Sequence, residues 1–143
     1  VELSLMSKDN LHIAIVDDEI EIHELFKINF KKEIRAQDYT FYYFKNGKDC
    51  NDFLETLDEN TIRDIVILSD INMPVMDGLE LLEHVKERHP KTELYIVTAY
   101  DNEEFKNKAL RLGSAGFLPK PVDFDHLKSF FKSLANKRGL NLS

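Results

Sequence analysis

Short apolar runs alternate with amphipathic stretches along this chain. The runs are too short for ordinary helices, and each predicts a β-strand. They cover Leu11–Val16, Tyr39–Phe44, Ile65–Leu68, Leu94–Val97 and Ala115–Leu118. Between and after them, apolar residues recur at the spacing that places them on one face of a helix. These helical patterns cover Ile20–Phe30, Phe53–Leu57, Leu79–Val85, Phe105–Leu112 and Phe124–Leu134.

The order of these elements is a strand followed by a helix, repeated five times. Such alternation predicts a parallel sheet covered by helices on both sides. The run Ile65–Leu68 is apolar at every position, as expected of a strand buried on both faces. We therefore expect one α/β domain over residues 11–137. The polar residues 1–10, which begin with Val rather than Met, are expected to be a leader or residues foreign to the protein, and residues 138–143 a loose C-terminal tail.

Composition narrows the class of protein. The chain has 143 residues, 43% of them apolar, and a net charge of −7. This charge argues against a nucleic-acid-binding domain, which usually presents a basic face. No apolar run is long enough to cross a bilayer, so we expect no membrane contact. Cys50 has no partner for an internal disulfide, which favours a reducing compartment, the cytoplasm, and a buried apolar role for the thiol.

Polar side chains gather where the expected strands end. Asp17 and Asp18 follow the first strand, Asp70 the third, Thr98 the fourth and Lys120 the fifth. Ligands of open α/β sheets bind beyond the carboxyl ends of the strands. We therefore expect these five side chains to form one site.

Three adjacent carboxylates repel one another and raise one another's pKa values, a conflict that a bound cation removes. Mg²⁺ is the natural candidate because it prefers carboxylate oxygens, water and phosphate oxygens. The ammonium group of Lys120 is suited to a phosphoryl oxygen.

At these residues the chain resembles the receiver domains of two-component response regulators, the CheY-like family. The resemblance extends from about Leu11 to Leu134. Its most diagnostic segments are Ser69–Gly78 and the Lys-Pro pair that ends the fifth strand. The matching segments are Val16-Asp17-Asp18-Glu19, Ser69-Asp70-Ile71-Asn72-Met73-Pro74-Val75-Met76-Asp77-Gly78, Val97-Thr98-Ala99-Tyr100 and Gly113-Ser114-Ala115-Gly116-Phe117-Leu118-Pro119-Lys120-Pro121.

The resemblance implies a fold and a metal site. The fold is a flavodoxin-like, doubly wound (βα)5 sandwich with five parallel strands in the order 2-1-3-4-5. Asp70 would be the phosphoacceptor. Asp17, Asp18, Asp70 and the backbone carbonyl of Asn72 would hold Mg²⁺, with Mn²⁺ as an alternative ion.

The resemblance also implies the parts of a switch. Lys120 would contact the phosphoryl group, and its peptide bond to Pro121 would be cis. Thr98 would hydrogen-bond the phosphoryl group, and Phe117 would be the aromatic residue that responds. The fourth helix, fifth strand and fifth helix would form the surface that changes.

The resemblance also implies which proteins the domain would bind, and other functions stay open beside the one it implies. The phosphoryl donor would be a histidine kinase or a histidine phosphotransfer protein, and a homodimer stays open. The domain would act as a signalling switch rather than an enzyme, apart from self-catalysed transfer and slow autodephosphorylation. One alternative is a degenerate receiver that binds partners without phosphate. Others are a flavodoxin-like electron carrier, disfavoured by the acidic first loop, and a dehalogenase-type phosphatase, disfavoured because Asn72 stands where its second aspartate would be.

Overall fold

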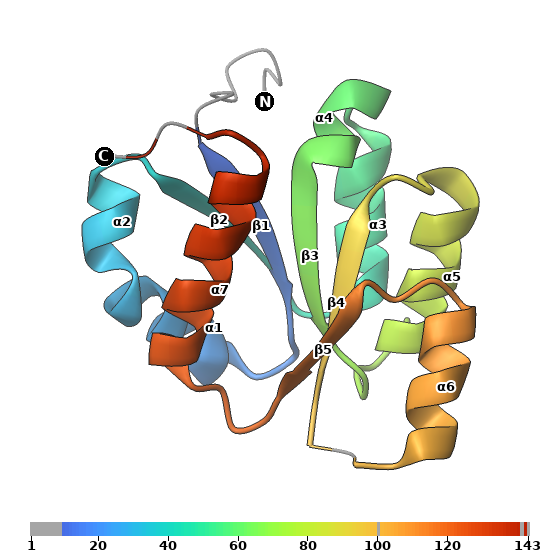
Figure 1. Ribbon diagram of the computed structural model, residues 1–143. Helices are drawn as coiled ribbons and strands as arrows, with labels where there is room; N and C mark the ends of the chain where they lie inside the picture. The colour runs from blue at the N-terminus through green and yellow to red at the C-terminus, as the bar shows by residue number, and fades with distance from the viewer. Residues whose placement is uncertain (1–9, 100, 141, 143) are drawn as a thin grey trace.

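A five-stranded parallel sheet lies at the centre of the molecule (Figure 1). The structure is a computed structural model that describes residues 10–99, 101–140 and 142. The strand order is β2-β1-β3-β4-β5, which confirms the expected fold class. The strands are β1 (Leu11–Val16), β2 (Tyr39–Phe44), β3 (Ile65–Asp70), β4 (Glu93–Thr98) and β5 (Gly116–Pro119).

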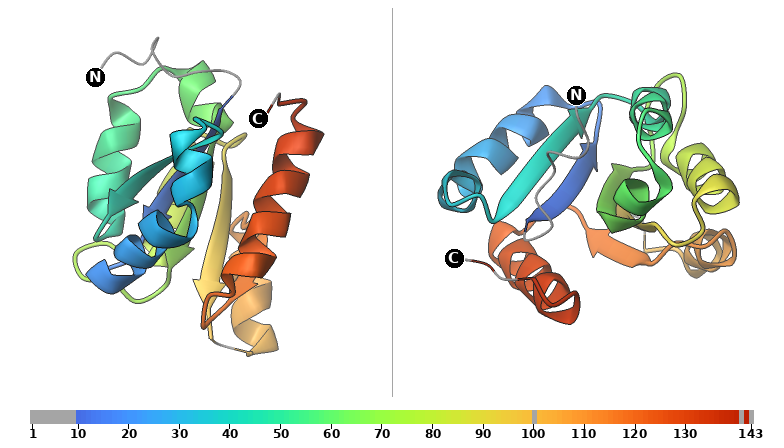
Figure 2. Two further views of the ribbon diagram at one scale, coloured as in Figure 1. Left: turned by 90° about the vertical axis from the view of Figure 1, so that its left-hand side faces the viewer. Right: turned by 90° about the horizontal axis from the view of Figure 1, so that it is seen from above.

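Helices cover both faces of the sheet (Figure 2). One face is covered by α1 and α7 and the other by α3, α5 and α6. The helices are α1 (Ile20–Asn29), α2 (Lys31–Arg35), α3 (Gly47–Glu55), α4 (Glu59–Asp64), α5 (Gly78–Arg88), α6 (Glu103–Arg111) and α7 (Phe124–Lys137).

Two helices, α2 and α4, were not among the five expected. They have five and six residues, too few for an apolar period to be recognised. Phe30 separates α1 from α2 and is fully buried. Asp58 is the N-cap residue before α4, and its side chain accepts a hydrogen bond from the backbone N–H of Thr61 at 2.8 Å.

The sheet divides the core into two apolar clusters. All six residues of β1 are buried, as are Ile65–Leu68 of β3, so these strands lie inside both layers. Phe26 of α1 and Phe30, which directly follows α1, pack with Phe131 of α7 on one face. Cys50 of α3 lies fully buried in the other cluster, which confirms its apolar role.

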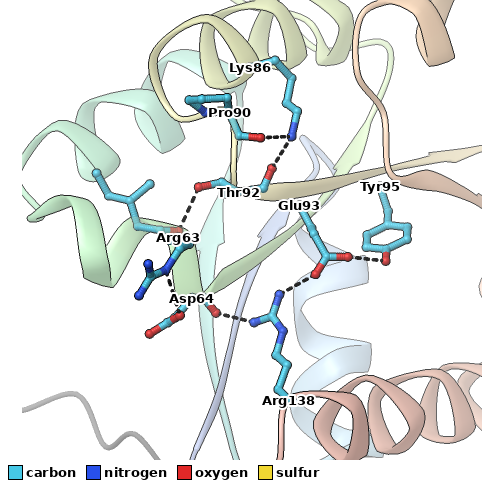
Figure 3. Close-up of polar contacts among 9 residues, drawn as sticks. Arg63, Asp64, Lys86, Pro90, Thr92, Glu93, Tyr95 and Arg138 are labelled. Carbon is cyan, nitrogen blue, oxygen red and sulfur yellow. Dashed lines mark hydrogen bonds and ion pairs between the residues drawn. The ribbon is translucent and has the colours of Figure 1, made fainter.

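The amino end of the sheet is joined to the end of α7 by polar contacts (Figure 3). Arg138, the first residue of the expected tail, donates hydrogen bonds to the carbonyl oxygen of Asp64 and to the carboxylate of Glu93, both at 2.7 Å. Tyr95 also donates to Glu93, at 2.8 Å. The expected leader, apart from Asn10, and residues 141 and 143 of the tail lie outside the described residues. Among the helices in the described ranges, none combines the length and hydrophobicity that a bilayer crossing requires.

Candidate functional site

Three carboxylates meet at the carboxyl edge of the sheet, the lower edge in Figure 1. Asp17 and Asp18 directly follow β1, and Asp70 is the last residue of the neighbouring β3. One carboxylate oxygen from each of the three lies within 4.8 Å of the others. Their oxygens are therefore close enough to bind one cation together, as the strand-end pattern predicts.

The two aspartates after β1 differ in their surroundings. Asp17 is only 4% exposed, whereas Asp18 is exposed. Burial raises the pKa of the Asp17 carboxyl, although a hydrogen bond from the backbone N–H of Glu19 and the charge of Lys120 act in the opposite direction. Repulsion from Asp70 is a smaller cause than burial. The expected rise in pKa is therefore present at Asp17, but desolvation is its main cause.

Lys120 lies between two of the carboxylates. Its Nζ is 3.1 Å from Oδ1 of Asp70 and 3.6 Å from Oδ2 of Asp17. Burial by itself would lower the pKa of Lys120, but the hydrogen bond to Asp70 and the charges of both aspartates outweigh it and raise the pKa. The ammonium group therefore stays charged beside the carboxylates.

The backbone around Lys120 fixes its position. Its N–H donates to the carbonyl oxygen of Thr98 at 3.0 Å, which ties the end of β5 to the end of β4. The Lys120–Pro121 peptide bond is cis, as the resemblance implies. The side chain of Thr98 is buried, and β4 pairs with β3 so that Val97 lies opposite Asp70. Thr98 is therefore the next residue along β4 after Val97, the residue that pairs with Asp70.

The loop after Asp70 is held close to the start of α5. The Asp70 carboxylate accepts a hydrogen bond from the N–H of Ile71, whose carbonyl oxygen accepts one from Gly78, both at 2.8 Å. A Cβ atom at Gly78 would overlap the carbonyl oxygen of Asp70, so only glycine fits there. Asp77 and Glu80 form a capping box that fixes the first turn of α5.

Asn72 lies in the loop after Asp70, and Phe117 lies on β5. Asn72 is exposed in the loop two residues after Asp70. Phe117 of β5 is half-buried and packs against the core between the sheet and α3–α6. Tyr100, in the motif that contains Thr98, lies outside the described residues.

The sequence reasoning did not identify Lys106 of α6. Its Nζ lies 6.0 Å from the centroid of the Phe117 ring and 3.2 Å from the carboxylate of Asp101. A lone lysine on an amphipathic helix is usually a solvated residue, so no pattern in the sequence distinguishes it. Lys106 links the loop after Thr98 to the aromatic side chain of β5.

The arrangement is suited to phosphoryl chemistry with a divalent cation. Carboxylate oxygens are hard ligands, and a cluster open on one side leaves positions for water and for a phosphate oxygen. The Asp70 carboxylate, 12% exposed, faces an ammonium that can neutralise charge on an incoming group. The residues present therefore fit a magnesium ion and a phosphoryl group together.

Comparisons with known proteins identify the family of this chain. The family model described as "Response regulator receiver domain" matches residues 13–132. The transcriptional regulatory protein DegU of Brevibacillus brevis is 29% identical over 130 residues, which are 91% of this chain and 52% of DegU. The DNA-binding transcriptional regulator NtrC of Escherichia coli is 36% identical over 113 residues, 79% of this chain and 22% of NtrC. The chain thus spans about half of one curated relative and about a fifth of the other.

A solved structure has the same fold. The CheY-like response regulator receiver domain protein of Methanospirillum hungatei superimposes with a TM-score of 0.74 at 25% identity. The superposition covers 91% of this chain and 97% of that one. With the matching family model, the shared strand order and the acidic cluster at the sheet edge, the chain belongs to the response regulator receiver domain family of two-component systems.

Proposed function

We propose that this domain is a phosphorylation switch in which Asp70 accepts the phosphoryl group. The observation that carries the proposal is the position of the Lys120 ammonium, 3.1 Å from the Asp70 carboxylate and beside two further aspartates. In this setting the ammonium group of Lys120 is placed to bind the transferred phosphoryl group, and the three aspartates are placed to bind a metal ion. Family membership supports the same reading.

The chemistry requires positioning and charge neutralisation more than covalent assistance. An oxygen of Asp70 attacks the phosphorus of a phosphohistidine, and the P–N bond to the imidazole breaks as the P–O bond forms. Asp17, Asp18, Asp70 and the carbonyl oxygen of Asn72 would hold Mg²⁺, or Mn²⁺ in its place. The ion supplies charge neutralisation for the phosphoryl oxygens. Lys120 exchanges its contact with Asp70 for a phosphoryl oxygen.

The proposed readout begins at Thr98. Its hydroxyl donates to a phosphoryl oxygen, which draws in the loop that leads to α6. Phe117 then adjusts on β5, and the contact between Lys106 and its ring changes with it. The altered surface comprises α6, β5 and α7. The aspartyl phosphate carries about 1.5–2 negative charges in place of the single charge of the Asp70 carboxylate, so the site gains about 0.5–1 negative charge, which biases two packed states.

The proposed partners follow from this reaction. The donor is a histidine kinase or a histidine phosphotransfer protein, and the proposed compartment is the cytoplasm. The domain itself acts as a switch rather than an enzyme, with slow self-catalysed dephosphorylation. NtrC is named as DNA-binding, but for this domain we propose no nucleic-acid contact because its net charge is −7.

The second candidate is a degenerate receiver that binds partners without phosphate. That reading would be favoured by loss of the phosphoacceptor, the lysine or the acidic pair. Asp17, Asp18, Asp70 and Lys120 are all present and gathered at one edge, so the phosphorylated switch is preferred.

Phosphorylation of the purified chain tests the proposal. Incubation with Mg²⁺ and acetyl phosphate should add one phosphoryl group, measured by intact-protein mass spectrometry. Asp70→Asn should abolish the addition. Asp52→Asn, which alters an exposed aspartate of α3, should not. Stoichiometric labelling of Asp70→Asn, or no labelling of the wild-type chain, would contradict the proposal.

A further inference from the structure

The loop between β3 and α5 contains a strained residue. Val75 has a φ of 70°, in the left-handed region that β-branched residues rarely adopt. Its side chain is 74% exposed, so little packing within this chain offsets the strain. Glycine or asparagine would adopt this conformation more readily.

Hydrogen bonds on both sides of Val75 impose the conformation. The N–H of Met76 donates to the carbonyl oxygen of Pro74 at 2.8 Å, and the carbonyl oxygen of Met76 accepts from Gly47 of α3 at 2.9 Å. The loop is closed by the bond from Gly78 to Ile71. Strained residues held in this way by their surroundings are concentrated at functional sites.

Val75 lies at the edge of the sheet that a phosphoryl-delivering protein would have to approach. The loop follows Asp70 at the carboxyl edge of β3. Ile20, which begins α1 after the neighbouring strand β1, is a second apolar side chain at this edge and is 48% exposed. Because the Asp70 side chain is only 12% exposed, a protein that delivers a phosphoryl group to it must lie against the surrounding loops.

We propose that Val75 is a specificity-determining contact for the protein phosphodonor, an inference that rests on the proposed function. The isopropyl group is held outward so that it packs against an apolar side chain beside the donor's phosphohistidine. A small donor such as acetyl phosphate reaches Asp70 without this contact. Val75 therefore affects transfer from a protein and not transfer from a small molecule.

The chain provides a matched control for backbone strain. Among the described residues, the other non-glycine with positive φ is Gln37, at 61°. Gln37 is exposed in the turn before β2, at the amino edge of the sheet and so away from Asp70. Val75→Gly and Gln37→Gly both relieve strain, but only the first removes an apolar group near the phosphoacceptor. Val75→Ile retains both the strain and the apolar group.

The experiment measures phosphotransfer from two kinds of donor. The protein donor is chosen from a panel of autophosphorylated histidine-kinase catalytic domains as the one that transfers fastest to the wild-type chain. With this donor, Val75→Gly should lower kcat/KM about tenfold, as expected for loss of one well-packed interface side chain. Val75→Ile and Gln37→Gly should stay near the wild-type value. With acetyl phosphate, all four proteins should be labelled at the same rate.

Each result has a defined meaning. Wild-type rates for Val75→Gly with the kinase would overturn the role of Val75 and leave the proposed function intact. So would slower labelling of this variant by acetyl phosphate, or a lower urea midpoint, since either indicates a structural role. Wild-type labelling by acetyl phosphate but by no kinase would also overturn it. A wild-type chain that acetyl phosphate does not label would instead contradict the proposed function.

Discussion

At the scale of single residues, Gly78 lies so close to the backbone of Asp70 that no side chain fits there. A methyl group there would overlap the carbonyl oxygen of Asp70, so either α5 or the end of β3 must move. Gly78→Ala should lower the free energy of unfolding by about 1–3 kcal/mol, as other overpacked substitutions do. It should also reduce labelling of Asp70 by acetyl phosphate. Urea unfolding and mass spectrometry measure the two effects.

Gly139 provides the comparison for this substitution. It has a φ of 68°, and a Cβ atom there would meet nothing within 4 Å. Gly139→Ala should cost about 1–2 kcal/mol through its backbone conformation, with labelling unchanged. If Gly78→Ala left labelling at the wild-type rate, the close approach of α5 to Asp70 would be unnecessary for the site.

Asp18 is the most exposed member of the acidic cluster, yet it is expected to bind the metal directly. Mg²⁺ affinity should be weak without phosphate, since the ion keeps several of its waters. Calorimetric titration should show that Asp18→Ala loses most of the binding heat. Glu21→Gln, which neutralises an acidic residue of α1 outside the cluster, should retain it. If Asp18→Ala and the wild-type chain gave the same heat of Mg²⁺ binding, Asp18 would not be a ligand of the metal.

At the scale of elements, the contact between Glu93 and Arg138 joins the start of β4 to the end of α7 (Figure 3). Burial alone would raise the pKa of Glu93, but hydrogen bonds from Arg138 and Tyr95 and the charge of Arg138 hold it below its ordinary value. A carboxyl whose pKa is lower in the folded state stabilises the fold above its unfolded pKa. This stabilisation is lost as the pH falls through the lowered, folded-state pKa.

Glu93→Gln should therefore lower the free energy of unfolding at neutral pH, by about 0.5–1 kcal/mol because the pair is partly solvated. The difference should shrink as the pH falls below about 4.5, the ordinary pKa of the group. Urea unfolding at a series of pH values measures it. Glu83→Gln, at an exposed position of α5, serves as the control. A loss that stays constant down to pH 3 would show that the charge of Glu93 has no part in the contact.

At the scale of the whole molecule, phosphorylation should change residues far from Asp70. The expected route runs from Thr98 through the following loop to α6, where Lys106 contacts Phe117 of β5. Beryllofluoride, which imitates a phosphoryl group, should shift backbone NMR signals across residues 103–118. Asp70→Asn with the same reagent should show none of these shifts. Changes confined to the loops around Asp18, Asp70 and Lys120 would mean that the proposed route is wrong.

The parallel sheet and the gathering of side chains at its carboxyl edge could be predicted because local pattern and the geometry of parallel strands determine them. The strand order was expected from the resemblance to receiver domains, and the structure confirms it. Apolar runs such as Ile65–Leu68 indicate strands buried on both faces. Since parallel strands end at one edge, Asp70, Thr98 and Lys120 were expected to lie together. The short helices α2 and α4 were missed because five or six residues do not complete an apolar period.

The sequence by itself determined which residues gather at the carboxyl edge, because a residue's place at a strand end is a local property. Only the tertiary structure decided their environments: the adjacent Asp17 and Asp18 differ in burial because the surrounding elements cover one and not the other. The contact of Lys106 with Phe117 and the bond of Arg138 to Glu93 join residues distant in the chain. The strain at Val75 likewise depends on closure of its loop against α3. Such features arise from packing between elements, which no local pattern encodes.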